Sequence, residues 1–119
     1  MRTAMLAAAC LAASVATAAA QGLGGSYRVS GKNFDGSSYS GTAEIVVTSS
    51  TTCRIRWVTG STTSQGICMR SGSVFAASYR LGNAVGLVIY EITPNGTLEG
   101  TWTIAEKSGV GTETLTPMK

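Results

Sequence analysis

Two cysteines occupy matching positions in one predicted β-hairpin. The segment Thr52–Arg70 is rich in strand-forming residues and carries Gly60-Ser61 near its middle. If Gly60-Ser61 forms a two-residue turn, counting outwards along both strands places Cys53 directly opposite Cys68. We therefore predict an antiparallel hairpin linked by a Cys53–Cys68 disulfide.

The first 20 residues read as a secretory signal peptide. One Arg precedes an Ala-rich apolar run, which ends in Ala18-Ala19-Ala20 before Gln21. This run is too short and too rich in Ala to remain as a membrane span. Lipoprotein processing at Cys10 is the less favoured alternative, since it would leave a signal of only nine residues. We expect residues 21–119 to form a single exported domain, periplasmic or extracellular and not inserted in a membrane, where oxidation favours the disulfide.

Eight short segments of residues 21–119 have the composition of β-strands. They are rich in Val, Ile, Thr, Tyr and Trp and are separated by Gly, Asn and Ser, and no window shows helical spacing of apolar residues. The segments cover residues 25–30, 39–48, 52–59, 63–70, 73–80, 85–92, 97–105 and 110–116. Because the connections are short, neighbouring segments should pair antiparallel. We predict an all-β fold, an eight-stranded up-and-down meander closing into a small barrel, with a β-sandwich as the alternative.

Alternation along the segments predicts which side chains face the barrel interior. Ile55 and Trp57 should share the face of Cys53, while Arg54 and Arg56 point outwards. Three further sets should each share one face of a strand: Ala43, Ile45 and Val47; Val85, Leu87 and Ile89; and Leu98, Trp102 and Ile104. Asn95-Gly96 has the composition of a type I′ hairpin turn.

Several phrases resemble a family of small secreted bacterial barrel proteins that is sometimes labelled fibronectin-binding. They are Gly25–Ile45, Ile55–Gly60, Val88–Ile92, Gly96–Trp102 and Gly111–Pro117, which together span most of residues 21–119. The resemblance implies a barrel fold and an extracellular-matrix or other protein partner, and it assigns no functional residues. A fainter likeness joins Gly25-Ser26-Tyr27 and Gly96–Gly100 to avidin-like and lipocalin-like barrels. Two tryptophans are too few to predict a biotin site.

The residue inventory argues against an enzyme and against a metal or cofactor. The sequence has no His and, after the signal peptide, only two Cys, so a four-ligand zinc site has no donors. Carboxylates are the remaining candidates for catalysis or ligand binding. Glu113 stands out because it lies two residues before Leu115 and so shares its face of the strand, which should point into the barrel. An inward Glu113 requires either an Arg or several hydrogen-bond donors to offset its desolvation, and Arg28 and Arg80 are the candidates for a structural ion pair.

Aromatic and basic side chains supply the candidate binding surface. Six aromatic side chains are candidates to line one mouth of the barrel, with packing in the core as an equal alternative: Tyr27, Tyr39, Trp57, Tyr79, Tyr90 and Trp102. Arg54 and Arg56 are candidates to meet an acidic partner from outside, although a solvated outer face is the favoured interpretation. Nine Lys and Arg, of which Arg2 lies in the signal peptide, leave eight scattered basic residues against six acidic ones. This mild, unclustered charge does not predict nucleic-acid binding. We expect a monomer or a weak dimer.

Three functions fit these features. The leading hypothesis is a non-enzymatic binding or interaction protein of unknown partner, for which the resemblance implies an extracellular-matrix or other protein. The first alternative is a carrier of small ligands, which requires an interior cavity of some hundreds of Å³. The second is an inhibitor of a lysozyme-type enzyme in the periplasm, which requires a protruding loop at residues 33–40 or 71–73.

Overall fold

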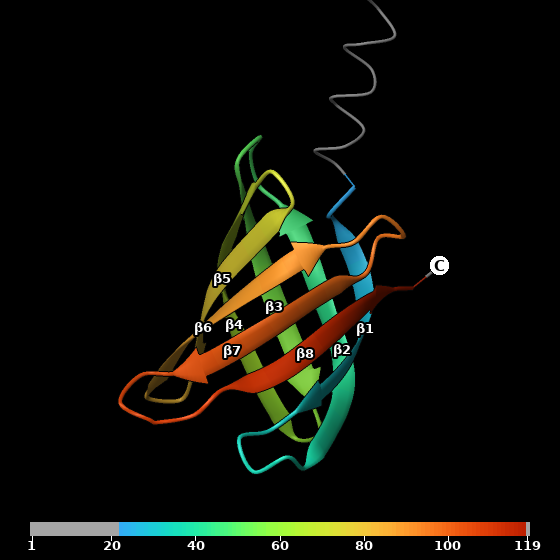
Figure 1. Cartoon of the computed structure of the whole chain (residues 1–119). Helices are drawn as coiled ribbons and strands as arrows, with labels where there is room; N and C mark the ends of the chain where they lie inside the picture. Colours follow the sequence, from blue (N-terminus) through green and yellow to red (C-terminus); the bar gives the residue numbers. More distant parts are fainter. Residues whose placement is uncertain (1–21, 119) are drawn as a thin grey trace, which may run out of the picture.

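A computed structural model describes residues 22–118 as a closed barrel of eight antiparallel strands in sequence order (Figure 1). The predicted barrel is confirmed, and the last strand pairs with the first. The predicted signal peptide, residues 1–20, lies outside the described residues. No helix within residues 22–118 is long and apolar enough to cross a membrane. The strands are β1 (Gly25–Lys32), β2 (Ser38–Val47), β3 (Thr52–Thr59), β4 (Thr62–Ser71), β5 (Val74–Leu81), β6 (Ala84–Ile92), β7 (Leu98–Ile104) and β8 (Gly111–Pro117).

The hairpin of β3 and β4 has the predicted register. Thr59 pairs with Thr62 across the Gly60-Ser61 turn, and Cys53 pairs with Cys68. Their Cα atoms are 5.0 Å apart and the predicted disulfide joins them. Gly60 has φ 61°, the conformation that the first residue of a type II′ hairpin turn requires.

The turn at Asn95-Gly96 differs from the type I′ prediction. Gly96 has φ 89°, but Asn95 does not have positive φ, and the Gly96 N–H donates to the Thr93 carbonyl at 3.0 Å. Pro94 fixes its own φ near −65° and so occupies the first central position of a type I turn. Gly96 then follows as the left-handed residue that completes the hairpin.

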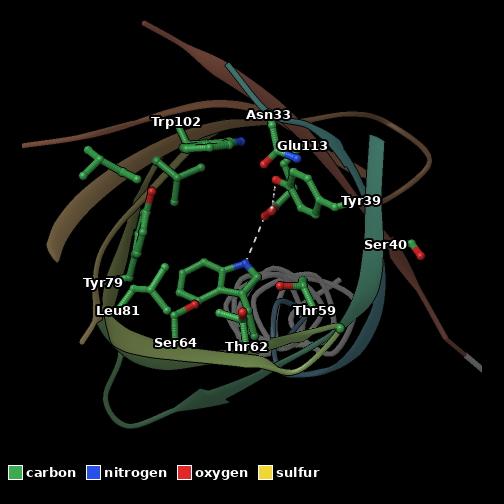
Figure 2. Close-up of a pocket in the computed structure, with 14 residues that line it drawn as sticks. Asn33, Tyr39, Ser40, Thr59, Thr62, Ser64, Tyr79, Leu81, Trp102 and Glu113 are labelled. Atoms are coloured by element: carbon green, nitrogen blue, oxygen red, sulfur yellow. Dashed lines mark hydrogen bonds between the residues drawn. The ribbon is translucent and has the colours of Figure 1, made fainter. Parts of the chain in front are cut away.

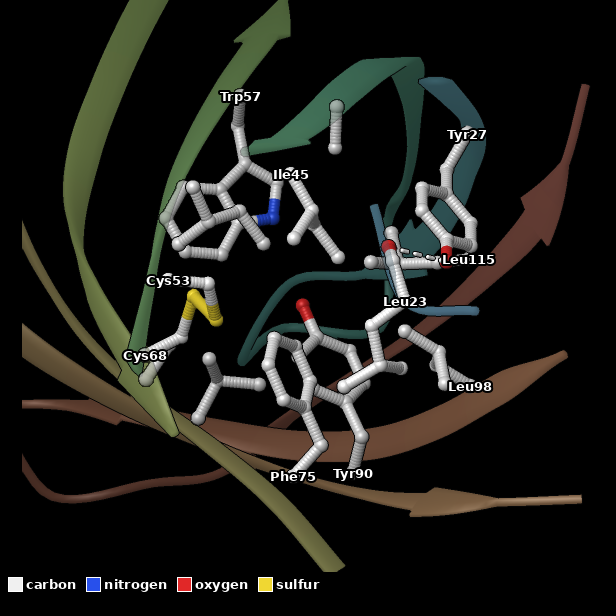
Figure 3. Packing of buried hydrophobic residues seen from close by; sticks show 14 of the residues in the cluster. Leu23, Tyr27, Ile45, Cys53, Trp57, Cys68, Phe75, Tyr90, Leu98 and Leu115 are labelled. Carbon is white, nitrogen blue, oxygen red and sulfur yellow. Dashed lines mark hydrogen bonds between the residues drawn. A yellow bond between two sulfur atoms is a disulfide. The ribbon is translucent and has the colours of Figure 1, made fainter. Parts of the chain in front are cut away.

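The packed core fills one end of the barrel, which we call the closed end (Figure 3). It lies towards the β2–β3, β4–β5 and β6–β7 turns, and Leu23, before β1, packs against it. The Tyr27 hydroxyl donates a 2.7 Å hydrogen bond to the Leu23 carbonyl and so ties this segment to the core. The largest fully buried side chains of the core are Tyr90, Phe75, Ile45, Ile55, Leu98, Leu115 and Val29.

The outer face carries the side chains that alternate with this core. Arg54 and Arg56 are exposed, as predicted. Val47 was predicted to share the inner face of Ile45, yet it is 38% exposed because it ends β2 at the rim of the barrel. Val85, Leu87 and Ile89 share the outer face of β6 and are all exposed.

Four aromatic rings inside the barrel lie directly over glycines of the neighbouring strand. The cross-strand pairs are Tyr39 with Gly31, Tyr79 with Gly86, Tyr90 with Gly100, and Trp102 with Gly111. A β-carbon added to any of these glycines would lie within 2.6 Å of the paired ring. Glycine therefore provides the space in which each ring lies flat against the barrel wall, an arrangement that also allows the sheet to curve.

Replacing Gly111 should test this arrangement. A β-carbon at Gly111 would lie 2.1 Å from Cε2 of Trp102. We expect Gly111→Ala to lower the free energy of unfolding by about 1–3 kcal/mol, the usual cost of overpacking, and to change the near-ultraviolet circular dichroism of Trp102. Urea denaturation measures the first effect.

The matched control is Thr116→Ala on the outer face of the same strand, which should change stability by less than about 0.5 kcal/mol. Alanine in place of a strand glycine usually stabilises when space is available. A more stable Gly111→Ala protein would therefore contradict the proposed contact.

Candidate functional site

The other end of the barrel, which we call the open end, contains a cavity of about 550 Å³ (Figure 2). It lies inside the barrel between the β1–β2, β3–β4 and β5–β6 turns and the last inward residues of β7. Its volume is within the range of known ligand sites. The residues that line it are Asn33, Tyr39, Ser40, Trp57, Thr59, Gly60, Thr62, Ser64, Tyr79, Leu81, Val88, Trp102, Ile104 and Glu113.

Aromatic rings from four strands form much of the cavity wall. Trp57 of β3 and Tyr79 of β5 meet edge to face, with ring centroids 5.4 Å apart. Tyr39 of β2 and Trp102 of β7 also meet edge to face, at 6.2 Å. The Tyr79 hydroxyl donates to the Thr103 carbonyl at 3.1 Å, and Nε1 of Trp102 donates to the Thr112 carbonyl at 3.3 Å. Both donors therefore bond to the backbone, so neither ring needs a hydrogen bond from a ligand.

The β1–β2 turn folds onto this wall. The Phe34 ring stacks on Trp102 with centroids 4.9 Å apart. Asp35 holds the turn, because its carboxylate accepts hydrogen bonds from the Ser37 N–H and hydroxyl at 2.9 and 2.6 Å. The same hydrogen bonds keep the pKa of Asp35 below its usual value. Phe34 thus packs against a residue of the cavity wall and is not itself one of the lining residues.

Glu113 is the one buried polar or charged residue in the described part of the chain. Its carboxylate accepts hydrogen bonds from three aromatic side chains on three other strands. Tyr39 donates to Oε1 at 2.7 Å, Nε1 of Trp57 donates to Oε2 at 2.9 Å, and the Tyr90 hydroxyl donates to Oε2. The inward orientation that parity with Leu115 predicted is therefore present.

The expected pairing of Glu113 with Arg28 or Arg80 is wrong. Both arginines are exposed, because each stands between two inward residues of its strand and so points outwards. Neutral donors on aromatic side chains replace the predicted cation. Such hydrogen bonds compensate part of the cost of taking a carboxylate out of water.

Burial and the carboxylate together alter the acidity of the tyrosines. Burial first, and then the negative charge of Glu113, raise the pKa of Tyr79 to about 12. The same two causes raise the pKa of Tyr39 and of Tyr90 well above the usual value, and hydrogen bonding to Glu113 adds to them. Burial alone raises the pKa of Tyr27. All the tyrosines therefore remain neutral hydrogen-bond donors well above neutral pH.

The structure brings together five of the residues that the sequence singled out. Tyr39, Trp57, Tyr79, Trp102 and Glu113 line one cavity. Tyr27 does not join them, because it enters the barrel at the start of β1 and packs in the closed end. Arg54 and Arg56 lie on the outer face of β3, away from the cavity.

Sequence reasoning missed other lining residues. Leu81, Val88 and Ile104 form the apolar part of the wall, and Thr59, Thr62 and Ser64 supply hydroxyls near the β3–β4 turn. Their inward parity was available from the sequence. Their distance along the barrel axis was not, because alternation identifies the face and not the depth.

The chemistry of the cavity is suited to binding. One carboxylate, four aromatic rings and several hydroxyls face the space, and the sequence has no His to act as a general base. Within residues 22–118, no three His, Cys, Asp or Glu side chains are grouped so that they would share a metal ion. A small ligand with a flat or apolar body fits these walls.

Similarity to known proteins is found at the level of structure alone. No protein-family model matches the sequence, and no curated protein matches it. The redesigned β-barrel b11L5F_LGL is similar with a TM-score of 0.73 and 16% identity, covering 84% of this chain and 95% of the other. The redesigned barrel mFAP1, solved bound to DFHBI, gives a TM-score of 0.70 and 20% identity over 82% and 96% of the two chains. A fatty acid transporter, REP1-NXSQ, gives 0.55 and 14% over 82% and 96%.

At these identities the comparisons support the small-barrel fold. They do not assign the chain to a protein family, so the likeness to proteins labelled fibronectin-binding depends on the sequence phrases alone. The fainter likeness to lipocalin-like barrels agrees with the fold of the transporter.

An alkaline titration should reveal the buried tyrosines. Unfolded tyrosines lose their protons near pH 10, whereas the folded ones hold them to higher pH. Above pH 10 the unfolded state therefore binds fewer protons, and the free energy of unfolding should fall as pH rises towards 12. Tyrosinate absorbance should stay low at pH 10 in the folded protein and be substantial in denaturant. A tyrosine that ionises near pH 10 in the folded barrel would contradict the described burial.

Proposed function

We propose that this protein binds a small molecule in the cavity at the open end of the barrel, and that it carries or sequesters this molecule without transforming it. The observation behind the proposal is a cavity of about 550 Å³ lined by aromatic rings and one buried carboxylate. A filled barrel interior would have excluded a carrier. The geometry therefore favours the carrier of small ligands, which is the hypothesis that required a cavity.

Two structural neighbours are associated with small molecules, which supports the proposal. The redesigned barrel mFAP1 was solved bound to DFHBI, and REP1-NXSQ is a fatty acid transporter. Small eight-stranded barrels have an interior just wide enough to hold one small ligand. We do not transfer either ligand to this chain, because its lining residues set their own chemistry.

The proposal has two further parts: the protein binds its ligand without catalysing a reaction, and it is exported to an oxidising compartment. Glu113 is the only carboxylate that lines the cavity among the described residues, so a carboxylate pair of the glycosidase type has no second member there. The Cys53–Cys68 disulfide suits a periplasmic or extracellular protein. The inhibitor hypothesis required a protruding loop at residues 33–40 or 71–73. Ser71 and Val74 pair directly across a two-residue turn, which leaves no long loop at residues 71–73, and Lys32 pairs with Ser38, so only residues 33–37 connect β1 and β2.

Blocking the cavity should abolish binding. Leu81 lines the open end, and Leu81→Trp would place a large ring in its mouth. We expect this variant to bind Nile red, a neutral apolar dye, on the order of tenfold more weakly or worse, which corresponds to a loss of about 1.4 kcal/mol. The measurement is dye fluorescence during titration with the protein.

Leu87→Trp is the matched control, because Leu87 is 59% exposed on the outer face of the adjacent strand. It introduces the same ring outside the cavity and should leave dye binding unchanged. If the wild-type protein gives no saturable increase in fluorescence, or if both variants bind as it does, the proposed site is not used.

A second candidate function, binding of a partner protein, has one observation in its favour. Four apolar side chains on the outer faces of β4 and β6 are more than half exposed: Ile67, Met69, Leu87 and Ile89. Groups of exposed apolar residues often mark interaction surfaces. The family resemblance suggests fibronectin as a partner to test.

Adding charge to this face should separate the two candidates. If a protein binds here, Ile67→Lys combined with Leu87→Lys should weaken binding to immobilised fibronectin roughly tenfold, as expected for the loss of two buried apolar contacts. Val110→Lys is the control, since Val110 is 62% exposed in the β7–β8 connection, outside this face. Surface plasmon resonance measures all three proteins. Equal binding by all three, or no binding by the wild type, would remove fibronectin as a partner of this face.

A further inference from the structure

The carboxylate of Glu113 has no cationic partner in the cavity. It is the only charged side chain among the described residues that line the space, and no Lys or Arg is among them. Buried ions are normally paired, because removing a lone charge from water costs several kcal/mol even after local relaxation. The three aromatic donors orient this charge without neutralising it.

The hydrogen-bond pattern of Glu113 leaves one acceptor position unfilled. An ionised carboxylate offers about four lone-pair sites. Oε2 accepts from Trp57 and Tyr90, while Oε1 accepts from Tyr39 alone. One further donor can therefore bond to Oε1, and the view into the cavity shows Glu113 at its wall beside Tyr39 (Figure 2).

The surrounding rings suit a cation in the same place. Tyr39 and Trp57 both bond to the carboxylate, and Tyr79 meets Trp57 edge to face. The faces of such rings attract ammonium groups within about 6 Å of the ring centre. Besides burial, the negative charge of Glu113 contributes to the raised pKa of Tyr79, so the electrostatic potential in this part of the cavity is negative.

We infer that the ligand is an amphiphilic amine, whose cationic nitrogen donates to Glu113 Oε1 and whose apolar or aromatic body lies against Leu81, Val88 and Ile104. This inference deepens the proposed function and rests on it. It also predicts that anionic ligands are rejected, because a second carboxylate beside Glu113 would meet a like charge in a site of low dielectric. A fatty acid with its head group at Glu113 is thereby disfavoured.

Three probes that share one ring and differ in their end group test this inference. Naphthylmethylamine is a cation, naphthylmethanol is neutral, and naphthoate is an anion. We expect wild-type protein to bind the amine roughly tenfold or more tightly than the alcohol, since a hydrogen bond to a charged group contributes a free energy of that order. Naphthoate should bind more weakly than the alcohol. Isothermal titration calorimetry avoids the overlap of naphthyl and Trp fluorescence.

Glu113→Gln tests the source of the preference. Glutamine has nearly the same shape without the charge, so the ratio of amine to alcohol affinity should fall towards one. Glu44→Gln makes the same change in net charge on the exposed face of β2 and should keep the wild-type ratio. Circular dichroism and thermal melting establish that each variant is folded. If Glu113→Gln does not fold, the three probes on the wild-type protein still decide the question.

The outcomes separate this inference from the function on which it rests. Equal or tighter binding of the alcohol or of naphthoate would overturn the amine and leave a ligand-binding cavity. A preference that persists in folded Glu113→Gln would overturn the role of Glu113. Failure of all three probes, together with failure of Nile red, would overturn the cavity function and the inference with it.

Discussion

The carboxylate of Glu113 holds the interior of this barrel together across four strands. It stands on β8 and accepts hydrogen bonds from Tyr39 on β2, Trp57 on β3 and Tyr90 on β6. Strands that are not neighbours in the sheet are thus joined through the interior. Tyr90 belongs to the packed core, whereas Tyr39 and Trp57 also line the cavity, so the carboxylate marks the boundary between the two halves. A polar network of this kind fixes one arrangement of side chains only when every member has a partner, and no buried side-chain polar atom of the described residues lacks one.

The pairing of aromatic rings with glycines explains how such large side chains fit inside eight strands. The small barrel leaves room for only a few rings, and each must lie along the wall rather than across the space. Glycine on the adjacent strand makes this possible for four rings: Tyr39, Tyr79, Tyr90 and Trp102. Two of them, Tyr39 and Tyr90, donate hydrogen bonds to Glu113. The glycines therefore contribute to the site although none of them carries a functional group.

The fold was largely predictable from the sequence, and the site only in part. Turn residues and alternation located all eight strands, and the Gly60-Ser61 turn placed Cys53 opposite Cys68 because register in a hairpin depends on local geometry. The same alternation pointed Glu113 inwards, and applied to Arg28 and Arg80 it would have excluded them as its partners. Depth along the barrel axis could not be predicted, because it depends on how all the strands are staggered on closure. Within one hairpin the depth does follow from local register: Tyr39 pairs with Gly31, four residues beyond Tyr27 along β1, so these two inward tyrosines lie towards opposite ends.

The distribution of side-chain size along the axis explains why only one end is open. Towards the closed end the inward positions hold large apolar residues such as Phe75, Ile55 and Leu98, and the disulfide links β3 and β4 among them. Towards the open end the inward positions of the same two strands hold Thr59, Thr62 and Ser64. These small hydroxyl side chains cannot fill the space that remains between the aromatic rings. The closed half of the barrel is thus packed, and the open half keeps a cavity in which the carboxylate of Glu113 has hydrogen-bond donors and no cationic partner among the described lining residues.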